Sequence, residues 1–365
     1  MSIYLDNGST TKIDPKVLRA MLPFLKEKYG NASAIYKLGA EAKEAIEKSR
    51  KQIAEKLNVN SEEIIFTSGG TESNNFAIKS IAFSNRDKGN HIITTKIEHK
   101  SVINVCKWLE TQGFEVTYLD VDENGYVKGL EEAITDKTIL VSIIHGHNEF
   151  GTIQNLEEIK NICGNIYLHT DACQSFTKFP IMADLISINA HKIHGPKGIG
   201  ALYIKKGVRI DEWQHGGGHE NRMRSGTENV SAIVGFGTSA IIDHRVEYIR
   251  ELKDYFINQL NKIDNIRINL SKDLPHVISM TIPKIEGEAI VGSLDMEGIC
   301  IATGSACNSN SLEPNQSLLA IGLNPQEVNS TIRITLSKFN TKKEIDKTVK
   351  VLQEIIKKLR DISPF

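Results

Sequence analysis

An excess of charge of one sign is missing from this sequence. Its 44 lysines and arginines nearly balance its 45 aspartates and glutamates, which gives a formal net charge of −1 over 365 residues. Proteins that bind nucleic acids or membrane surfaces directly usually carry a basic excess, so we expect neither partner here. The N-terminus also lacks the basic and apolar segments of a secretory signal. The longest mostly apolar stretch, residues 230–242, is too short to span a bilayer.

Paired cysteines are missing as well. The chain has five cysteines: Cys106, Cys163, Cys173, Cys300 and Cys307. Their number is odd and they form no C-x-x-C motif, which argues against a zinc ribbon, a thioredoxin-type redox pair and a disulfide framework. Reduced thiols in the cytoplasm are the simplest interpretation. Cys307 lies among small and polar residues, which is typical of a reactive thiol on an exposed loop. The apolar neighbours of Cys300 predict a buried, inert thiol instead.

Short β-branched runs alternate with amphipathic segments through the first two thirds of the chain. Seven apolar runs predict buried strands at residues 64–66, 92–95, 116–119, 139–144, 166–168, 185–188 and 201–204. With the helical periodicity between them, they predict an α/β domain with a mostly parallel sheet over residues 15–245. Residues 1–14 and 246–365 predict a smaller α+β domain. Its expected elements are strands near 276–282 and 331–336 and helices at 243–260, 287–296 and 345–359.

Three segments that follow predicted strands carry candidate chemistry. Small residues at 67–74 precede a helix, where backbone N–H groups bind phosphate; the alternative is a Ser or Thr N-cap. Asp171 is suited to pair with a protonated pyridine nitrogen, and the alternative is again a helix cap. Lys192 is suited to form a Schiff base, and the alternative is an ordinary surface lysine.

Taken together, motifs along nearly the whole chain resemble the cysteine desulfurases, within the class V aminotransferase group of pyridoxal-phosphate enzymes. The motifs stand in the family's order, at residues 4–7, 29–31, 67–75, 98–99, 148–151, 171–174, 191–200, 217–220, 224–227, 303–314 and 332–333. The resemblance implies the aspartate-aminotransferase-like fold of pyridoxal-phosphate-dependent transferases. It also implies a cytoplasmic homodimer that releases sulfur from L-cysteine as a sulfurtransferase. The short loop ending at residues 311–314 is similar to the branch that serves iron–sulfur cluster assembly and tRNA thiolation.

The resemblance further implies a role for each matching residue. Lys192 binds pyridoxal 5'-phosphate as a Schiff base, Asp171 keeps the pyridine nitrogen protonated, and His99 stacks on the ring. Cys307 attacks the sulfur of L-cysteine and becomes a persulfide, while Arg333 binds the substrate carboxylate. The remaining residues that it implies for cofactor or substrate binding are Gly70, Thr71, Asn148, Gln174, Asn189 and His191. Thr227 of the partner subunit is implied to reach the cofactor's phosphate.

Three departures from the family pattern affect these expectations. Asn189 replaces the usual Ser or Thr at the phosphate, and Tyr36 replaces the usual His. The chain ends at Phe365 without the tail that many relatives use to dock an iron–sulfur scaffold protein. The sulfur acceptor is therefore left open between such a scaffold and a tRNA-thiolation enzyme. With a scaffold, Cys307 is a candidate transient iron–sulfur ligand.

Other functions compete with this interpretation. A selenocysteine lyase or a transaminase shares the fold, although a transaminase does not need Cys307. An inactive sulfur carrier is disfavoured because Lys192 and Asp171 are both present. A nucleotide-binding protein is disfavoured because neither of the glycine-rich nucleotide-binding motifs, G-x-x-x-x-G-K-[ST] and G-x-G-x-x-G, occurs. His215 and His219 have the spacing of a helical metal site, but the three glycines between them are poor helix formers, so we expect no metal.

Overall fold

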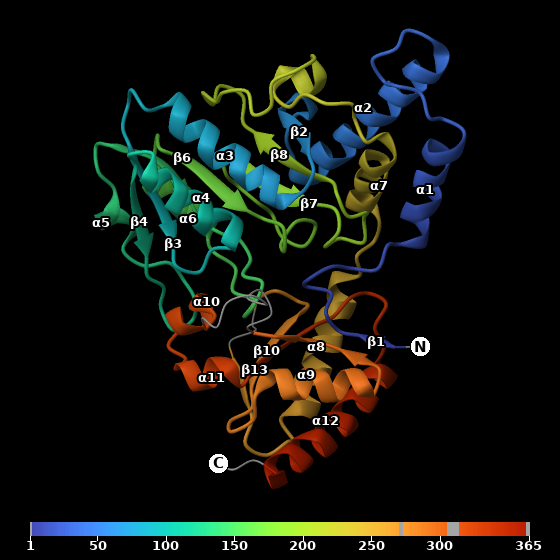
Figure 1. Ribbon diagram of the computed structural model, residues 1–365, viewed down its shortest axis with the longest axis vertical. Helices are drawn as coiled ribbons and strands as arrows, with labels where there is room; N and C mark the ends of the chain where they lie inside the picture. Colours follow the sequence, from blue (N-terminus) through green and yellow to red (C-terminus); the bar gives the residue numbers. More distant parts are fainter. Residues whose placement is uncertain (1, 270–272, 305–313, 363–365) are drawn as a thin grey trace.

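The larger of the two main sheets has seven strands and lies in the upper part of the molecule (Figure 1). The computed structural model describes residues 2–269, 273–304 and 314–362. β8 is antiparallel to both of its neighbours, and every other pair is parallel. The sheet is therefore mostly parallel, as the sequence predicts. The strands lie in the order β2 (Ile64–Thr67), β8 (Gly200–Ile204), β7 (Leu185–Asn189), β6 (Tyr167–Asp171), β5 (Thr138–Ser142), β3 (His91–Thr95) and β4 (Glu115–Leu119).

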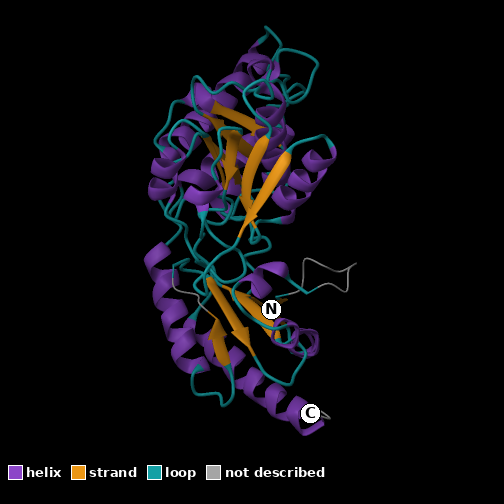
Figure 2. Ribbon diagram, turned by 90° about the vertical axis from the view of Figure 1, so that its left-hand side faces the viewer, coloured by secondary structure: helices purple, strands orange, loops and turns teal. Residues whose placement is uncertain are grey.

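Helices cover both faces of this sheet, because its central strands are apolar on both sides (Figure 2). Ile186 and Ile188 of β7 belong to the apolar cluster of one face, and Leu185 belongs to that of the other. The first face is covered by α1 (Pro15–Lys26), α2 (Lys37–Leu57) and α7 (Val230–Ile241). The other carries α3 (Gly70–Ser84) and α4 (Lys100–Thr111). Short helices α5 (Leu130–Ala133) and α6 (Leu156–Cys163) complete this part.

A smaller antiparallel sheet lies below, in the order β12 (Ala302–Thr303), β13 (Thr331–Thr335), β10 (Val277–Thr281) and β9 (Arg267–Asn269). Around it lie α8 (Val246–Leu260), α9 (Gly287–Met296), α10 (Gln316–Ala320), α11 (Pro325–Asn329) and α12 (Lys342–Ile362). Ile345, Leu352 and Ile356 of α12 recur at helical spacing and are buried in its core, which explains why this amphipathic sequence folds here. Among the described residues, no helix has the length and apolar character needed to cross a membrane.

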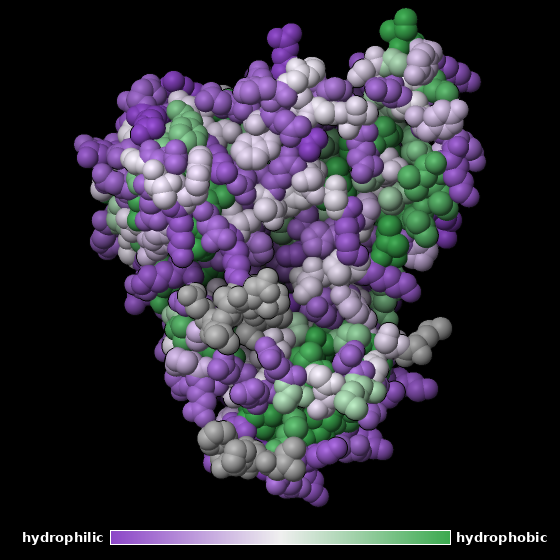
Figure 3. Space-filling view, in the orientation of Figure 1, coloured by the Kyte–Doolittle hydropathy of each residue, from purple (hydrophilic) through white to green (hydrophobic). Residues whose placement is uncertain are grey.

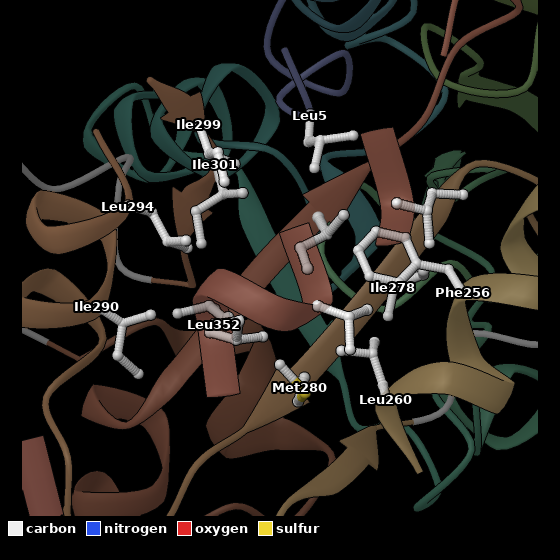
Figure 4. Packing of buried hydrophobic residues seen from close by; sticks show 14 of the residues in the cluster. Leu5, Phe256, Leu260, Ile278, Met280, Ile290, Leu294, Ile299, Ile301 and Leu352 are labelled. Atoms are coloured by element: carbon white, nitrogen blue, oxygen red, sulfur yellow. The ribbon is translucent and has the colours of Figure 1, made fainter. Parts of the chain in front are cut away.

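The N-terminal segment belongs to the core of the smaller sheet. β1 (Ile3–Tyr4) pairs with β11 (Ile299–Cys300), and Leu5 belongs to the same apolar cluster as Ile278 and Phe256 (Figure 4). Residues 3–5 therefore join a core that is otherwise built from residue 249 onward. We propose the division that the sequence predicts, with residues 15–245 as one domain and residues 1–14 and 246–365 as the other.

Candidate active site

Four parallel strands end at one edge of the large sheet, and polar residues follow each of them. His99 follows β3, Asn148 follows β5, Asp171 ends β6, and Lys192 lies on the turn after β7. This edge is where ligands bind in open α/β sheets. The backbone of His191 fixes the turn, because its carbonyl accepts hydrogen bonds from both N (2.8 Å) and Oγ1 (2.7 Å) of Thr11.

Asp171 is a buried carboxylate held by two donors. Its Oδ1 accepts a 3.0 Å hydrogen bond from the backbone N of Cys173, and its Oδ2 accepts a 2.7 Å bond from Nδ2 of Asn74. Burial by itself would raise the pKa of Asp171, but His99, these hydrogen bonds and Lys192 together hold the pKa below its ordinary value. The alternative role as a helix cap is wrong, because turns follow Asp171 rather than a helix.

His99 presents a neutral imidazole near this carboxylate. Burial, opposed by Asp171 and assisted by Lys192, lowers the pKa of His99. The ring caps α4, with Nδ1 lying 2.8 Å from Oγ of Ser101 and accepting a 3.2 Å bond from its backbone N. Ser101 Oγ also accepts a 2.8 Å bond from Asn74, so Asn74 connects the Asp171 and His99 sides of the site.

The segment at residues 67–74, where the sequence predicts phosphate binding, leads from β2 into the start of α3. The alternative of a Ser or Thr N-cap is wrong: the cap is Gly69, and no side chain caps this helix end. A Cβ on Gly70 would come within 2.5 Å of Cys173 Sγ and 3.4 Å of Asn189 Nδ2, so only glycine leaves this approach open. Thr71 is exposed in the first turn beside it.

Arg333 reaches the site from β13 of the smaller sheet. Its two terminal nitrogens donate to Glu149 Oε1 (2.7 Å) and to Asp6 Oδ1 (3.1 Å). Asn148 donates a 2.6 Å bond from Nδ2 to the same oxygen of Glu149. The predicted substrate-binding residues Asn148 and Arg333 are therefore joined through a third residue that the sequence analysis gave no role.

A cavity of about 790 Å³ opens beside these residues. His99, Asn148 and Glu149 line it from the large sheet, and Pro314 and Asn315 line it from the other side. Cys307 lies outside the described residues, in the segment 305–313 that directly precedes Pro314. The cavity has the size of a small-molecule site, and neither Lys192 nor Asp171 lines it.

Known proteins are similar to this chain along nearly its whole length. The family model for class-V aminotransferases matches residues 3–348. The chain is 47% identical to a cysteine desulfurase IscS of Dictyoglomus turgidum, over all of this chain and 96% of the relative, and 46% identical to one of Methanosarcina thermophila, over all of this chain and 94% of that relative. The chain belongs to the cysteine desulfurases of the class-V aminotransferase family.

Solved structures agree with this desulfurase assignment. A structure named as a NifS-like protein superposes with a TM-score of 0.92 at 37% identity, covering 98% of this chain and all of its own. A second structure, titled SspA in complex with cysteine, has a TM-score of 0.84 at 35% identity over 93% of this chain and all of its own. The predicted fold of pyridoxal-phosphate-dependent transferases is confirmed.

In the desulfurase site, Gln174 has hydrogen-bond partners within the chain. Its Nε2 donates a 2.9 Å hydrogen bond to the carbonyl of Gly8, and its Oε1 lies 3.1 Å from Nε2 of His276. The amide thus bridges the two sheets, and its predicted bond to the cofactor hydroxyl stays a prediction. Thr227 is exposed, on a segment that Arg224 ties to Glu72 of α3 through a 2.9 Å ion pair.

The thiols of the desulfurase also separate into two kinds. Cys106, Cys163 and Cys173 are buried, and burial raises the pKa of each, to about 11 for Cys163. The prediction that Cys300 is buried is wrong: it is partly exposed, because the two-residue pairing of β1 with β11 covers it only on one side. Within the described ranges, no group of three or more side chains is arranged to hold a metal ion.

Sequence reasoning missed two residues of this site, Asn74 and Glu149. Both lie inside motifs that carry the resemblance, and both are buried. A buried polar residue needs hydrogen-bond partners, which is the signal that distinguishes them. That signal appears only once the burial of each side chain is known.

Proposed function

We propose that this chain uses pyridoxal 5'-phosphate to remove sulfur from L-cysteine, which yields L-alanine and a persulfide on Cys307. The observation that carries the proposal is the juxtaposition of Lys192 with the ionised, buried Asp171 at the ends of adjacent parallel strands. Membership in the desulfurase family supports the reaction.

The residues present suit this cofactor. The start of α3 offers backbone N–H groups to a phosphate, and the missing Cβ of Gly70 leaves room for it. Asn189, His191, Thr71 and the partner subunit's Thr227 would complete this cradle. Asp171 would hold the proton on the pyridine nitrogen, since its lowered pKa keeps it anionic.

Other side chains would bind the ring. His99, neutral and partly buried, would stack on its face. Asn148 and Gln174 would hydrogen-bond its hydroxyl or the substrate. Lys192 would hold the cofactor covalently. When bound, pyridoxal phosphate supplies an electron sink that weakens the bonds at the substrate α-carbon.

The chain's own groups then divide the work. Arg333 binds the substrate carboxylate, and the freed amine of Lys192 takes and returns a proton at the α-carbon. The Cys307 thiolate forms a bond to the substrate sulfur while the C–S bond breaks. The electron pair of that bond stays on carbon, which takes up a proton and becomes the methyl group of alanine.

A homodimer and a sulfur acceptor complete the proposal. Apolar side chains gather over α1 on the face seen in Figure 3, and exposed apolar residues on and after this helix would be covered by a second copy: Leu18, Leu25, Tyr29, Ile35 and Tyr36. The acceptor would be an iron–sulfur scaffold or a tRNA-thiolation enzyme, as the IscS name of the relatives suggests. We propose that the enzyme acts in the cytoplasm.

One purified sample tests the proposal. The protein should be yellow, its absorption spectrum should change on addition of L-cysteine, and alanine and sulfide should form. Borohydride should fix the cofactor to the chain, and peptide mapping should locate the adduct on Lys192. A colourless protein that takes up no added pyridoxal phosphate would contradict the proposal.

A further inference from the structure

Arg333 is held by two carboxylates that differ in burial. One terminal nitrogen donates to Glu149 Oε1 at 2.7 Å, and both of these side chains are only 4% exposed. The other terminal nitrogen donates to Asp6 Oδ1 at 3.1 Å, and the Asp6 side chain is 20% exposed. One guanidinium therefore has two acidic partners, one buried and close, the other more exposed and more distant.

Glu149 is built into the large sheet. It follows β5, and its Oε1 accepts hydrogen bonds from both Arg333 and its neighbour Asn148, at 2.7 and 2.6 Å. Its Oε2 is buried without a hydrogen-bond partner among the described residues. Removing this shared acceptor is costly, because it leaves two donors without the partner that holds them. Glu149 therefore fixes Arg333 and Asn148 as one unit across the two sheets.

Asp6 holds Arg333 from the N-terminal segment instead. Ser9 shares this contact: its Oγ donates to Asp6 Oδ1 at 2.9 Å and accepts from Arg333 at 2.9 Å. Ser9 is exposed, and Asp6 is partly exposed, so water can replace these contacts when they open. Of the two acidic partners, Asp6 is therefore the one that a competing anion displaces more easily, because its side chain is more exposed and its contact with Arg333 is longer.

Both terminal nitrogens of Arg333 already donate to a protein carboxylate. A substrate carboxylate that binds Arg333 must therefore replace one of these acceptors. Resting on the proposed function, we propose that Glu149 is a positioning residue that keeps Arg333 in place. Asp6 is a competitor that yields its position to the carboxylate of cysteine. The two acidic residues on one arginine thus have opposite effects on substrate affinity.

The test measures ligand binding to cofactor-loaded protein that carries Cys307→Ala, so that L-cysteine binds without turnover. Calorimetric titration compares L-cysteine with cysteamine, which has the same amine and thiol but no carboxylate. Asp6→Asn should bind L-cysteine about threefold more tightly, because an uncharged amide competes less. Glu149→Ala should bind it about tenfold or more weakly, because Arg333 loses its buried anchor. Glu149→Gln keeps an acceptor oxygen and should stay within about threefold of the parent protein.

The signs decide the outcome. Tighter or unchanged binding by Glu149→Ala, or weaker or unchanged binding by Asp6→Asn, would overturn the proposal. So would an equal change for cysteamine, since the effect would then not pass through the carboxylate. Should Glu149→Ala fail to fold, the partly exposed Asp6→Asn still tests the competition for Arg333. A parent protein that prefers L-cysteine no more than cysteamine would count against the proposed function itself, before any variant is compared.

Discussion

Asn74 of α3 donates a 2.7 Å hydrogen bond from Nδ2 to Oδ2 of Asp171 at the end of β6. The same nitrogen donates at 2.8 Å to Ser101, whose hydroxyl contacts the ring of His99. Both donor positions of this amide are therefore used inside the site. Asn74 is the group that fixes the carboxylate in a set position relative to the imidazole.

Replacing Asn74 by Ala should raise the pKa of Asp171 and weaken its hold on a protonated pyridine nitrogen. A hydrogen bond to a charged group contributes about 1.5–3 kcal/mol, so kcat/KM for L-cysteine should fall by about tenfold or more. Cofactor retention on dialysis should fall as well, measured by absorbance. The exposed Asn161→Ala on α6 is the control and should change neither. Full activity and full cofactor retention in Asn74→Ala would show that Cys173 N alone suffices to hold Asp171.

The positions of individual strands and helices were predictable, because local sequence patterns determine them. The β-branched run at 185–188 lies within β7, and the 345–359 periodicity lies within α12. Apolar runs on both faces predict a covered parallel sheet, and parallel strands carry their carboxyl ends to one edge. That argument alone brings Asp171 and Lys192 together.

The partners of these residues were not predictable in the same way. Glu149 and Asp6 pair with Arg333 across 184 and 327 residues of sequence. No local pattern tells which of the chain's acidic residues will meet an arginine on β13. The error at Cys300 has the same origin: apolar neighbours predict burial, but exposure depends on how much of β11 the N-terminal segment covers.

Gly70→Ala tests the close approach at the start of α3. The added Cβ would lie 2.5 Å from Cys173 Sγ, and such overpacking costs about 1–3 kcal/mol of the free energy of unfolding. Cofactor affinity should fall too, because the methyl group occupies the phosphate approach. The double variant with Cys173→Ala should recover stability.

Gly292→Ala is the matched control for this substitution. It lies exposed inside α9 with no atom within 4 Å of its new Cβ, and should stabilise the protein by about 0.5–1 kcal/mol. Denaturant titration measures both changes. A Gly70→Ala variant as stable and as well loaded with cofactor as the wild type would contradict the steric argument.

Glu98 should make stability depend on pH. Burial, with a further contribution from Asp171, raises its pKa to about 8, although Ile144 N and Thr95 Oγ1 donate to its Oε1. Between the ordinary value of 4.5 and 8, the folded protein keeps a proton that the unfolded chain has lost. The stability that this proton supplies is therefore fully present below pH 4.5 and is lost as pH rises through 8.

The comparison with Glu98→Gln isolates this effect from the buried histidines. The free energy of unfolding of the wild type minus that of the variant should fall by roughly 3–5 kcal/mol between about pH 4.5 and 8. Denaturant titrations at several pH values measure it. Glu251→Gln, on the exposed face of α8, should show no such trend. A difference that is constant, or that rises with pH, would mean that Glu98 is ionised in the folded protein.

Cys307 should carry the sulfur, and the other four thiols should not. Burial raises the pKa of Cys106, Cys163 and Cys173, which leaves little thiolate to react at neutral pH. Cys307→Ala should still show a spectral change with L-cysteine, because Lys192 and Arg333 remain. Alanine and sulfide production should fall to near background. Mass spectrometry after brief exposure to cysteine should find one added sulfur on the wild-type peptide that contains Cys307.

Cys300→Ala is the control for this experiment, and its partial exposure makes it a demanding one. A thiol that solvent reaches but that cannot reach the substrate sulfur should be dispensable. Cys300→Ala should therefore keep most of the wild-type turnover. Limiting iodoacetamide should inactivate the wild type in step with alkylation of Cys307, whichever other thiol it also labels. Added sulfur on Cys173 or Cys300, or full activity in Cys307→Ala, would show that a different residue is the nucleophile. The sulfur would then leave the enzyme from that residue instead of Cys307.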